Sequence, residues 1–276
     1  MQTGIHDIPN EEYHSGPGIS KSGLWTIWNQ TPAHYYAKTQ EPQEESDDAK
    51  DFGSAAHAAI LEPEVFEEKF FCGPDVRRNT NVWKDAALYA QSQGKVILKP
   101  SDYYAVERLR DQAARHPILR LLTSEADIEK SAYWIDEETG ELCRVRPDAY
   151  SRKHKIIGDL KTTTSAGHDK WIRRVVDFGY HVQEPFYSDG WQLAGGGDVE
   201  GFVFVVVERD PPHLFAVYEL DPDSVEEGRH IYRAALKIYA DCKKNNSWPG
   251  YADNVQSLSL PRWAFRFVQP QLDAAE

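Results

Sequence analysis

The sequence predicts a single domain of the α/β (α+β) class, with a central mixed sheet flanked by helices and a helical N-terminal layer. Two observations predict this fold class. Apolar residues recur at helical spacing through the first half of the 276-residue chain, whereas strand-like segments dominate from residue 128 onward and alternate with further helices. Such elements pack in layers around one core. Because no Gly/Ser/Pro-rich linker divides the chain, we expect one domain.

Three helices are expected in the first half, each with a recognisable start or stop. They cover residues 20–31, 52–61 and 101–113. Ser20 or Ser22 is the candidate N-cap of the first helix, and Ser101 is that of the third. Pro63 stops the second helix, and Pro117 marks a break or a new start.

The second half is expected to supply the sheet. The expected strands cover residues 128–135, 141–150, 155–162, 202–207 and 214–220, with a turn at 137–140. The fourth strand is a continuous β-branched and aromatic run, which is typical of a central buried strand, and the fifth is expected beside it. The helices expected here begin at Thr164 or Ser165, cover residues 180–193, and begin at Asp221 or Asp223.

The chain is acidic on average, but its charge is unevenly distributed. It has 31 Lys and Arg against 44 Asp and Glu, which gives a net charge of −13. This balance argues against a protein that binds nucleic acid by bulk electrostatics. Much of the acidity lies in residues 1–71, including a run at 41–48 that we expect to be a surface loop, whereas residues 144–174 hold nine basic and three acidic residues. That basic segment is either a solvated face or part of a binding site.

Cysteine usage and hydropathy exclude several classes of protein. Cys72, Cys143 and Cys242 are too far apart for a CxxC-type metal cluster, and their odd number argues against a disulfide framework. The N-terminus lacks the basic region and apolar run of a secretory signal, and no stretch approaches the ~18 apolar residues of a membrane helix. We therefore expect a cytoplasmic protein without membrane contact.

The most informative stretch of the sequence is a predicted hairpin. If strands 141–150 and 155–162 pair across a tight turn, residues whose numbers sum to 307 lie opposite each other, and Asp148 and Asp159 satisfy this condition. Like charges at opposed positions are destabilising, so a cation should lie between them. Period-2 alternation puts Lys161 on the same face as Asp159. Two carboxylates and a lysine on one sheet face suit Mg²⁺, which prefers oxygen ligands.

A plainer interpretation of this hairpin also fits its spacing. Arg146 and Lys161 satisfy the same sum, so the two aspartates could face water and pair with these cations. The context favours a metal site over solvent-facing ion pairs, because the apolar run Ile156–Gly158 leads directly into Asp159. That carboxylate should therefore emerge from the core and not from a loop tip.

These residues carry a resemblance to a known family. Pro147-Asp148, followed by Asp159-x-Lys161, resembles the signature of the PD-(D/E)XK nucleases. The segment Gly53–Pro63 resembles the helix that carries the metal-binding histidine in their RecB-like branch, and Gln183–Tyr187 resembles the QxxxY motif of that branch. Segments similar to the RecE-type exodeoxyribonucleases (exonuclease VIII family) are Ile19–Ser22, Glu129–Ser131 and Leu260–Ala264.

The resemblance implies a PD-(D/E)XK restriction-endonuclease-like core and a set of site residues. The implied metal ligands are His57, Asp148, Asp159 and the backbone carbonyl of Leu160, which would bind Mg²⁺, with Mn²⁺ as a substitute. Lys161 would position or activate the attacking water, and it adds electrostatic stabilisation. Gln183 and Tyr187 lie at i and i+4 on one helix face, where they could bind substrate phosphate or orient Lys161. The alternative interpretation is that these two side chains form an ordinary pair on the helix surface, without a role in the site.

The sequence offers further candidate residues for the metal site and for DNA contact. Glu129 either lies near the metal or pairs with a neighbouring arginine. Arg146, Arg173 and Arg174 are candidate contacts for the DNA backbone. Trp171 is a candidate for base stacking, with packing in the core as its alternative. Within a single nuclease domain over residues 1–276, we expect a mainly helical part (1–125) carrying His57, a catalytic core (126–246) and a C-terminal extension (247–276).

The resemblance implies a Mg²⁺-dependent exodeoxyribonuclease that acts on double-stranded DNA ends. It further implies 5′-to-3′ degradation that leaves 3′ single strands, a partner annealing protein of the RecT type, and a ring-shaped homo-oligomer in a bacterial or phage-infected bacterial cytoplasm. An acidic exterior with a basic channel would then explain the charge distribution. The alternative is a catalytically silent fold that binds DNA ends or serves assembly. A Cas4-like nuclease with an iron–sulfur cluster would need four cysteines, and the chain has three.

Overall fold

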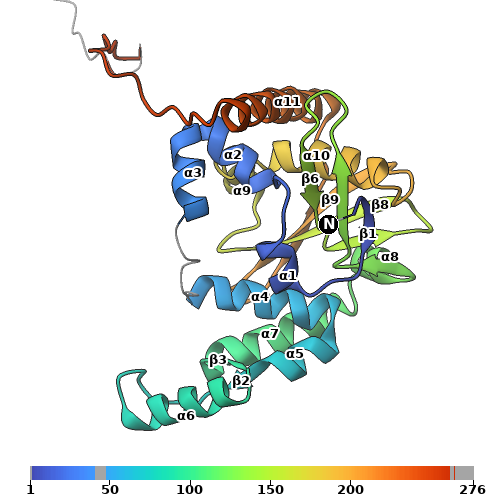
Figure 1. Cartoon of the computed structure of the whole chain (residues 1–276). Coiled ribbons are helices and arrows are strands. Elements are labelled where there is room, and N and C mark those ends of the chain that lie inside the picture. The colour runs from blue at the N-terminus through green and yellow to red at the C-terminus, as the bar shows by residue number, and fades with distance from the viewer. Residues whose placement is uncertain (1, 41–47, 262–263, 265–276) are drawn as a thin grey trace, which may run out of the picture.

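A mixed sheet lies at the centre of the computed structural model, which describes residues 2–40, 48–261 and 264 (Figure 1). The strand order is β10-β9-β8-β7-β4. The strands are β4 (Ala126–Ile128), β7 (Ala149–Ser151), β8 (Ile156–Thr163), β9 (Gly201–Glu208) and β10 (Phe215–Tyr218). β8 and β9 are parallel, whereas the other neighbouring strands are antiparallel. The predicted fold class is confirmed, and the predicted central strand at 202–207 is β9.

Helices cover both faces of this sheet, and each face has its own core. On one face lie α2 (Lys21–Asn29), α9 (His168–Asp177), α10 (Tyr180–Leu193) and α11 (Pro222–Asn245). On the other lie α4 (Asp48–Leu61), α5 (Pro63–Lys69), α7 (Pro100–Ala113) and α8 (Pro117–Thr123). Figure 1 shows α11 and α10 on the opposite side of the sheet from α4, α5 and α7.

The remaining elements extend this framework. A second sheet has the order β1-β5-β6 and consists of β1 (Gly4–His6), β5 (Ser131–Ile135) and β6 (Leu142–Val145). A parallel pair, β2 (Phe70–Cys72) and β3 (Val96–Leu98), lies with α6 (Asn81–Ser92) beyond α7 in Figure 1. The other helices are α1 (Asn10–Ser15) and α3 (Pro32–Gln40).

Side-chain alternation along β8 decides which face carries the polar residues of interest. Ile157 packs into the core beneath α10, whereas Leu160 packs into the core beneath α4. Successive side chains of a strand point to opposite faces. Asp159 and Lys161 therefore lie on the α10 side of the sheet.

Several of the predicted helix boundaries are confirmed. α2 follows Ser20, α4 ends at Leu61 before Pro63 but begins at Asp48 and not at residue 52, and α10 covers residues 180–193 as predicted. α11 begins after Asp221, whose side chain accepts hydrogen bonds from the two backbone N–H groups at positions 223 and 224.

Two predicted caps are wrong. α7 begins at Pro100 and not after Ser101, because proline fits the first helical position, where a backbone N–H has no intrahelical partner. α9 begins at His168 and not after Thr164 or Ser165. The backbone N–H of Ser165 is already bonded to the threonine hydroxyl two residues earlier, in a turn that precedes the helix.

Two predicted strands are each broken into two, and this correction matters for the site. The segment 128–135 is interrupted at Glu129, which has a left-handed φ of 51°, so β4 joins the central sheet and β5 joins the second sheet. The segment 141–150 is interrupted around Pro147, which has no N–H for the ladder. The backbone N–H of Glu129 donates to the Asp148 carbonyl at 3.1 Å, so both breaks meet where the two sheets meet.

Two expectations concern residues that the structure does not describe. The acidic run lies outside the described residues except for Asp48, and so do Arg262 and Trp263 of the segment 260–264. Among the described helices, none combines the length and the apolar character that crossing a bilayer requires.

Candidate active site

The register predicted for the hairpin is confirmed. Ala149 pairs with Gly158, and the two pairs that follow obey the same sum. Asp148 and Asp159 come next in this register, and the Asp148 Oδ2 accepts the backbone N–H of Leu160 at 2.6 Å. A direct contact between these two strands therefore fixes the Asp148 carboxylate.

The predicted opposition of Arg146 and Lys161 is wrong, because β6 belongs to the second sheet and the ladder between β7 and β8 does not extend to Arg146. The Arg146 guanidinium instead donates to Glu129 Oε2 at 2.7 Å, to the Ser131 hydroxyl at 2.8 Å and to the Ile8 carbonyl at 2.9 Å. Arg146 thus holds the N-terminal segment and Glu129 in place, and its own side chain is only 10% exposed.

A group of three side chains has the composition of a metal site. His57, Glu129 and Asp148 place their ligand atoms within 4.8 Å of one another. The His57 Nδ1 lies 3.5 Å from Asp148 Oδ2. α4 contacts β8 at this point: Gly53, one turn before His57, faces Thr162, whose hydroxyl would lie 3.4 Å from an added Cβ.

Burial and neighbouring carboxylates shift the pKa values of these three groups. Burial raises the pKa of Glu129 to about 7, with the Asp148 charge adding to the effect and Arg146 opposing it. Burial, followed by the charge of Asp159, raises the pKa of Asp148. Burial lowers the pKa of His57, which favours the neutral imidazole that binds metals. One nitrogen and several carboxylate oxygens therefore fit a divalent cation such as Mg²⁺ or Mn²⁺.

Asp159 lies beside this cluster and is bonded to other groups. It is 1% exposed; its Oδ1 accepts a hydrogen bond from Gln183 Nε2, and its Oδ2 pairs with the Lys161 ammonium. The structure therefore groups Glu129, and not Asp159, with His57 and Asp148. The Leu160 peptide follows Asp159 directly and contacts the three-residue cluster, because its N–H donates to Asp148 and its backbone also hydrogen-bonds His57.

A second lysine, Lys21, lies near Lys161. The Lys161 Nζ lies 5.0 Å from the Tyr180 ring centroid, and the Lys21 Nζ lies 5.4 Å from the same centroid. Lys21 donates to the Phe178 carbonyl at 2.6 Å. Burial, followed by repulsion from Lys161, lowers the pKa of Lys21 to about 7. Sequence reasoning missed Lys21 as a site residue, although it noted the segment around it.

Gln183 and Tyr187 lie one turn apart on α10, as predicted, but their contacts differ. Gln183 is buried and bonds Asp159, not Lys161. Tyr187 lines a cleft of about 560 Å³ together with the three candidate metal ligands. Burial holds the pKa of the Tyr187 hydroxyl well above its usual range, so it is a hydrogen-bond donor at neutral pH.

The charge of this cleft differs from the expected basic channel. Its carboxylates are Glu11, Glu62, Glu129 and Asp148, whereas its only lysine or arginine residues are Lys69 and Arg146 among the described residues that line it. Four of the nine basic residues of the segment 144–174 pair with described carboxylates. For example, Arg152 pairs with Asp127, and Lys155 pairs with Asp198 and Glu200. Without a bound cation, the cleft would repel a phosphate.

The three remaining candidates lie on α9. Arg173 is exposed, and the Arg174 guanidinium lies 5.9 Å from the centroid of the half-exposed Phe178 ring. Trp171 is 3% exposed and stacks on Tyr180, so it belongs to the core.

Comparisons with known proteins agree with this architecture. A family model described as a PDDEXK-like domain of unknown function (DUF3799) matches residues 20–261. The chain is similar to a solved protein from Eubacterium rectale described as a "putative exonuclease", with 14% identity over 93% of this chain and 97% of that one, and a TM-score of 0.63. At that identity the likeness shows the fold alone.

A phage-related exonuclease from Haemophilus somnus 129PT also matches, with 13% identity over 70% of this chain and 95% of that chain, but its TM-score is 0.34. Among curated proteins, no sequence matches the chain.

Proposed function

Because the chain belongs to the PDDEXK-like domain family (DUF3799), we propose that it is a metal-dependent exodeoxyribonuclease that acts on the ends of double-stranded DNA. The family match supports a nuclease. The observation that carries the proposal is the cluster of His57, Glu129 and Asp148 beside the Asp159–Lys161 pair. A metal-binding group and a fixed cation next to it are the components that phosphodiester hydrolysis requires.

We assign His57, Glu129 and Asp148 as the residues that would hold the divalent ion, with Asp159 and the Leu160 carbonyl beside them. A divalent ion bound there would lower the pKa of a water molecule and offset charge on the phosphate. The acidic lining of the cleft supports metal dependence, since the lining itself offers little attraction for phosphate.

Lys161 supplies positive charge and does not act as a proton acceptor in this proposal. Burial lowers its pKa, but Asp159 and Asp148 more than offset that effect and hold the pKa above the usual lysine range. The ammonium therefore remains charged at neutral pH, where it can stabilise negative charge that develops on the phosphate. Gln183 is a positioning residue, because it acts through the hydrogen bond that orients Asp159.

The sequence resemblance supports finer proposals. We propose a RecE-type enzyme that degrades DNA from 5′ to 3′, forms a ring-shaped homo-oligomer, and supplies 3′ single strands to an annealing protein of the RecT type in a bacterial cytoplasm. In its domain organisation, residues 1–125 would deliver His57 to a catalytic core at 126–246, followed by an extension at 247–276.

The central test uses linear duplex DNA with Mg²⁺ or with EDTA, and compares the wild type with Asp159→Asn. We expect the wild type to release nucleotides only with Mg²⁺ and the variant to release far fewer. Equal rates for the two proteins would contradict the mechanism. DNA-end binding without hydrolysis would favour the alternative, a catalytically silent module.

Two further measurements test the finer proposals. Duplexes blocked at the 5′ or the 3′ end report the polarity of degradation. Light scattering that gives the mass of a monomer at micromolar concentration would contradict the ring.

A further inference from the structure

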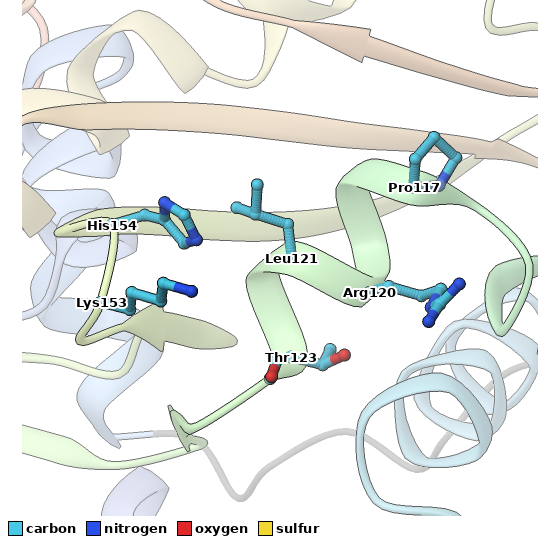
Figure 2. A pocket seen from close by; sticks show the side chains of 7 residues that line it. Pro117, Arg120, Leu121, Thr123, Lys153 and His154 are labelled. Atoms are coloured by element: carbon cyan, nitrogen blue, oxygen red, sulfur yellow. The ribbon is translucent and has the colours of Figure 1, made fainter.

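A basic groove lies at the far end of the catalytic hairpin, away from the cleft. It has a volume of about 550 Å³ and lies between α8 and the turn that joins β7 to β8. Figure 2 shows Lys153 and His154 on one side of the groove and Arg120 on the other, with Leu121 and Thr123 between them. The residues that line it include no carboxylate.

The basic residues of this groove have no ion-pair partner among residues 2–40, 48–261 and 264. Arg152 and Lys155, on either side of the turn, pair with acidic residues. In contrast, the structure records no ion pair between Lys153, His154 or Arg120 and another described residue. Arg120 and Lys153 are exposed. In a chain of net charge −13, a groove lined by two exposed cations and a histidine, with no carboxylate in its lining, forms a local site for an anion.

The shape of the groove favours an extended anion over a small one. Its lining begins at Pro117, the first residue of α8, and ends at Ser124, directly after that helix. At ~1.5 Å per helical residue, the groove is about 10 Å long. Duplex DNA rises ~3.4 Å per nucleotide along its axis, so a groove of this length parallel to the axis would span about three nucleotide steps. Lysine, arginine and hydroxyl side chains are the usual contacts of the DNA backbone.

We propose that this groove, formed by Arg120, Lys153 and His154 with the hydroxyls of Thr123 and Ser124, binds the sugar–phosphate backbone of the DNA substrate. The inference rests on the proposed nuclease function and adds a contact remote from the reaction. The groove lies on the turn before Ile156, and three residues of extended strand, ~10 Å, separate Ile156 from Asp159. The groove would therefore hold DNA at least about three nucleotide steps from the scissile phosphate.

The packing of α8 connects the groove rigidly to the catalytic strand. Gly158, next to Asp159, faces Leu122 of α8 so closely that an added Cβ would lie 2.8 Å from the leucine Cδ1. Leu122 is fully buried, whereas its neighbours on the helix line the groove. DNA bound along α8 would thus have a fixed position relative to β8.

The test measures binding of a fluorescent 24-base-pair duplex in EDTA over a series of salt concentrations. We compare the wild type, Lys153→Ala, Arg120→Ala/Lys153→Ala, and the control Lys84→Ala. Lys84 is an exposed lysine of α6, with no recorded ion pair to a described residue. Each groove cation removed should reduce the slope of log affinity against log salt by about 0.9, which is about an eightfold loss of affinity at 0.1 M salt.

Degradation assays and a competitor separate the outcomes. With Mg²⁺, the double variant should show a raised KM and an unchanged kcat, because the groove is remote from the reacting atoms. If the wild type degrades DNA and the groove variants bind it like Lys84→Ala, the groove proposal is wrong while the nuclease stands. If the wild type neither binds nor degrades DNA, both proposals fail. If the variants bind DNA normally but no longer bind inorganic pyrophosphate, the groove is a site for small anions and the proposal is overturned.

Discussion

Glu184 offers a sharp test of the physical reasoning, because it places a carboxyl group inside the protein without adequate compensation. It follows Gln183 on α10, is 7% exposed, and its Oε2 is buried without a hydrogen-bond partner among the described residues. The nearby Arg229 already binds Asp189 through two hydrogen bonds. Burial, followed by the charge of Glu219, raises the pKa of Glu184 to about 8.

The sign of the pH effect follows from this shift. The unfolded chain releases the proton near the ordinary glutamate pKa of 4.5, whereas the folded protein keeps it until about pH 8. Between these values the folded state binds one more proton, so the free energy of unfolding falls as pH rises. The stabilising contribution is complete below pH 4.5 and is lost by pH 8.

The magnitude is bounded by the size of the shift. A change of about 3.5 pKa units at ~1.4 kcal/mol per unit gives a ceiling of about 5 kcal/mol. Reorientation of the side chain toward water at high pH would reduce this, so we expect about 2–3 kcal/mol. Glu184→Gln keeps the shape and removes the titration, so it should become more stable than the wild type as pH rises.

The assay is urea unfolding of both proteins at pH 5, 6, 7, 8 and 9. The difference in unfolding free energy should grow with pH and level off above pH 8. The control is Glu68→Gln, which neutralises an exposed carboxylate of α5 and should give no such trend. A difference between Glu184→Gln and the wild type that stays constant from pH 5 to 9 would refute the reasoning.

Three further predictions concern the site and its support. Mn²⁺ should raise the melting temperature of the wild type but not of Asp148→Asn, because metal binding to the folded state stabilises it; an equal rise in both would exclude Asp148 as a ligand. Gly228→Ala should cost more than about 3 kcal/mol in urea unfolding, because the new Cβ would lie 1.7 Å from the His181 carbonyl oxygen, whereas Gly250→Ala, with its nearest atom at 3.7 Å, should be near neutral. Lys161→Met should reduce the nuclease rate by about 10²-fold with DNA binding in EDTA retained, and an unchanged rate would remove its electrostatic role.

The hairpin shows how much local pattern can predict. The apolar run before Asp159 and the short polar turn were enough to predict β8 and its register with β7, because period-2 alternation and tight-turn geometry are local properties. Pro147 also carried a usable signal for the break between β6 and β7, since proline cannot donate to a ladder. That signal was not applied to the predicted strand at 141–150.

The positions of Glu129 and Lys21 at the site could not be predicted from local sequence patterns. Glu129 joins His57 and Asp148 because its left-handed backbone turns the chain from one sheet to another, and no periodicity predicts which sheet a short strand joins. Lys21 reaches the site because α2 packs against α10, which is a contact between segments about 160 residues apart. Gln183 was predicted on the correct helix face, but its partner Asp159 depends on how α10 lies on β8.

The sequence by itself determined the fold class, the central strands, the helices α10 and α11, and the pairing that brings Asp148 next to Asp159 in register. These features follow from side-chain period, turn chemistry and helix caps, all of which act over a few residues. The tertiary structure decided which donors share one cation site, which cations of the basic segment are already paired, and where unpaired ones gather at α8. Those outcomes depend on burial and on contacts between distant segments, which the order of residues along the chain does not display.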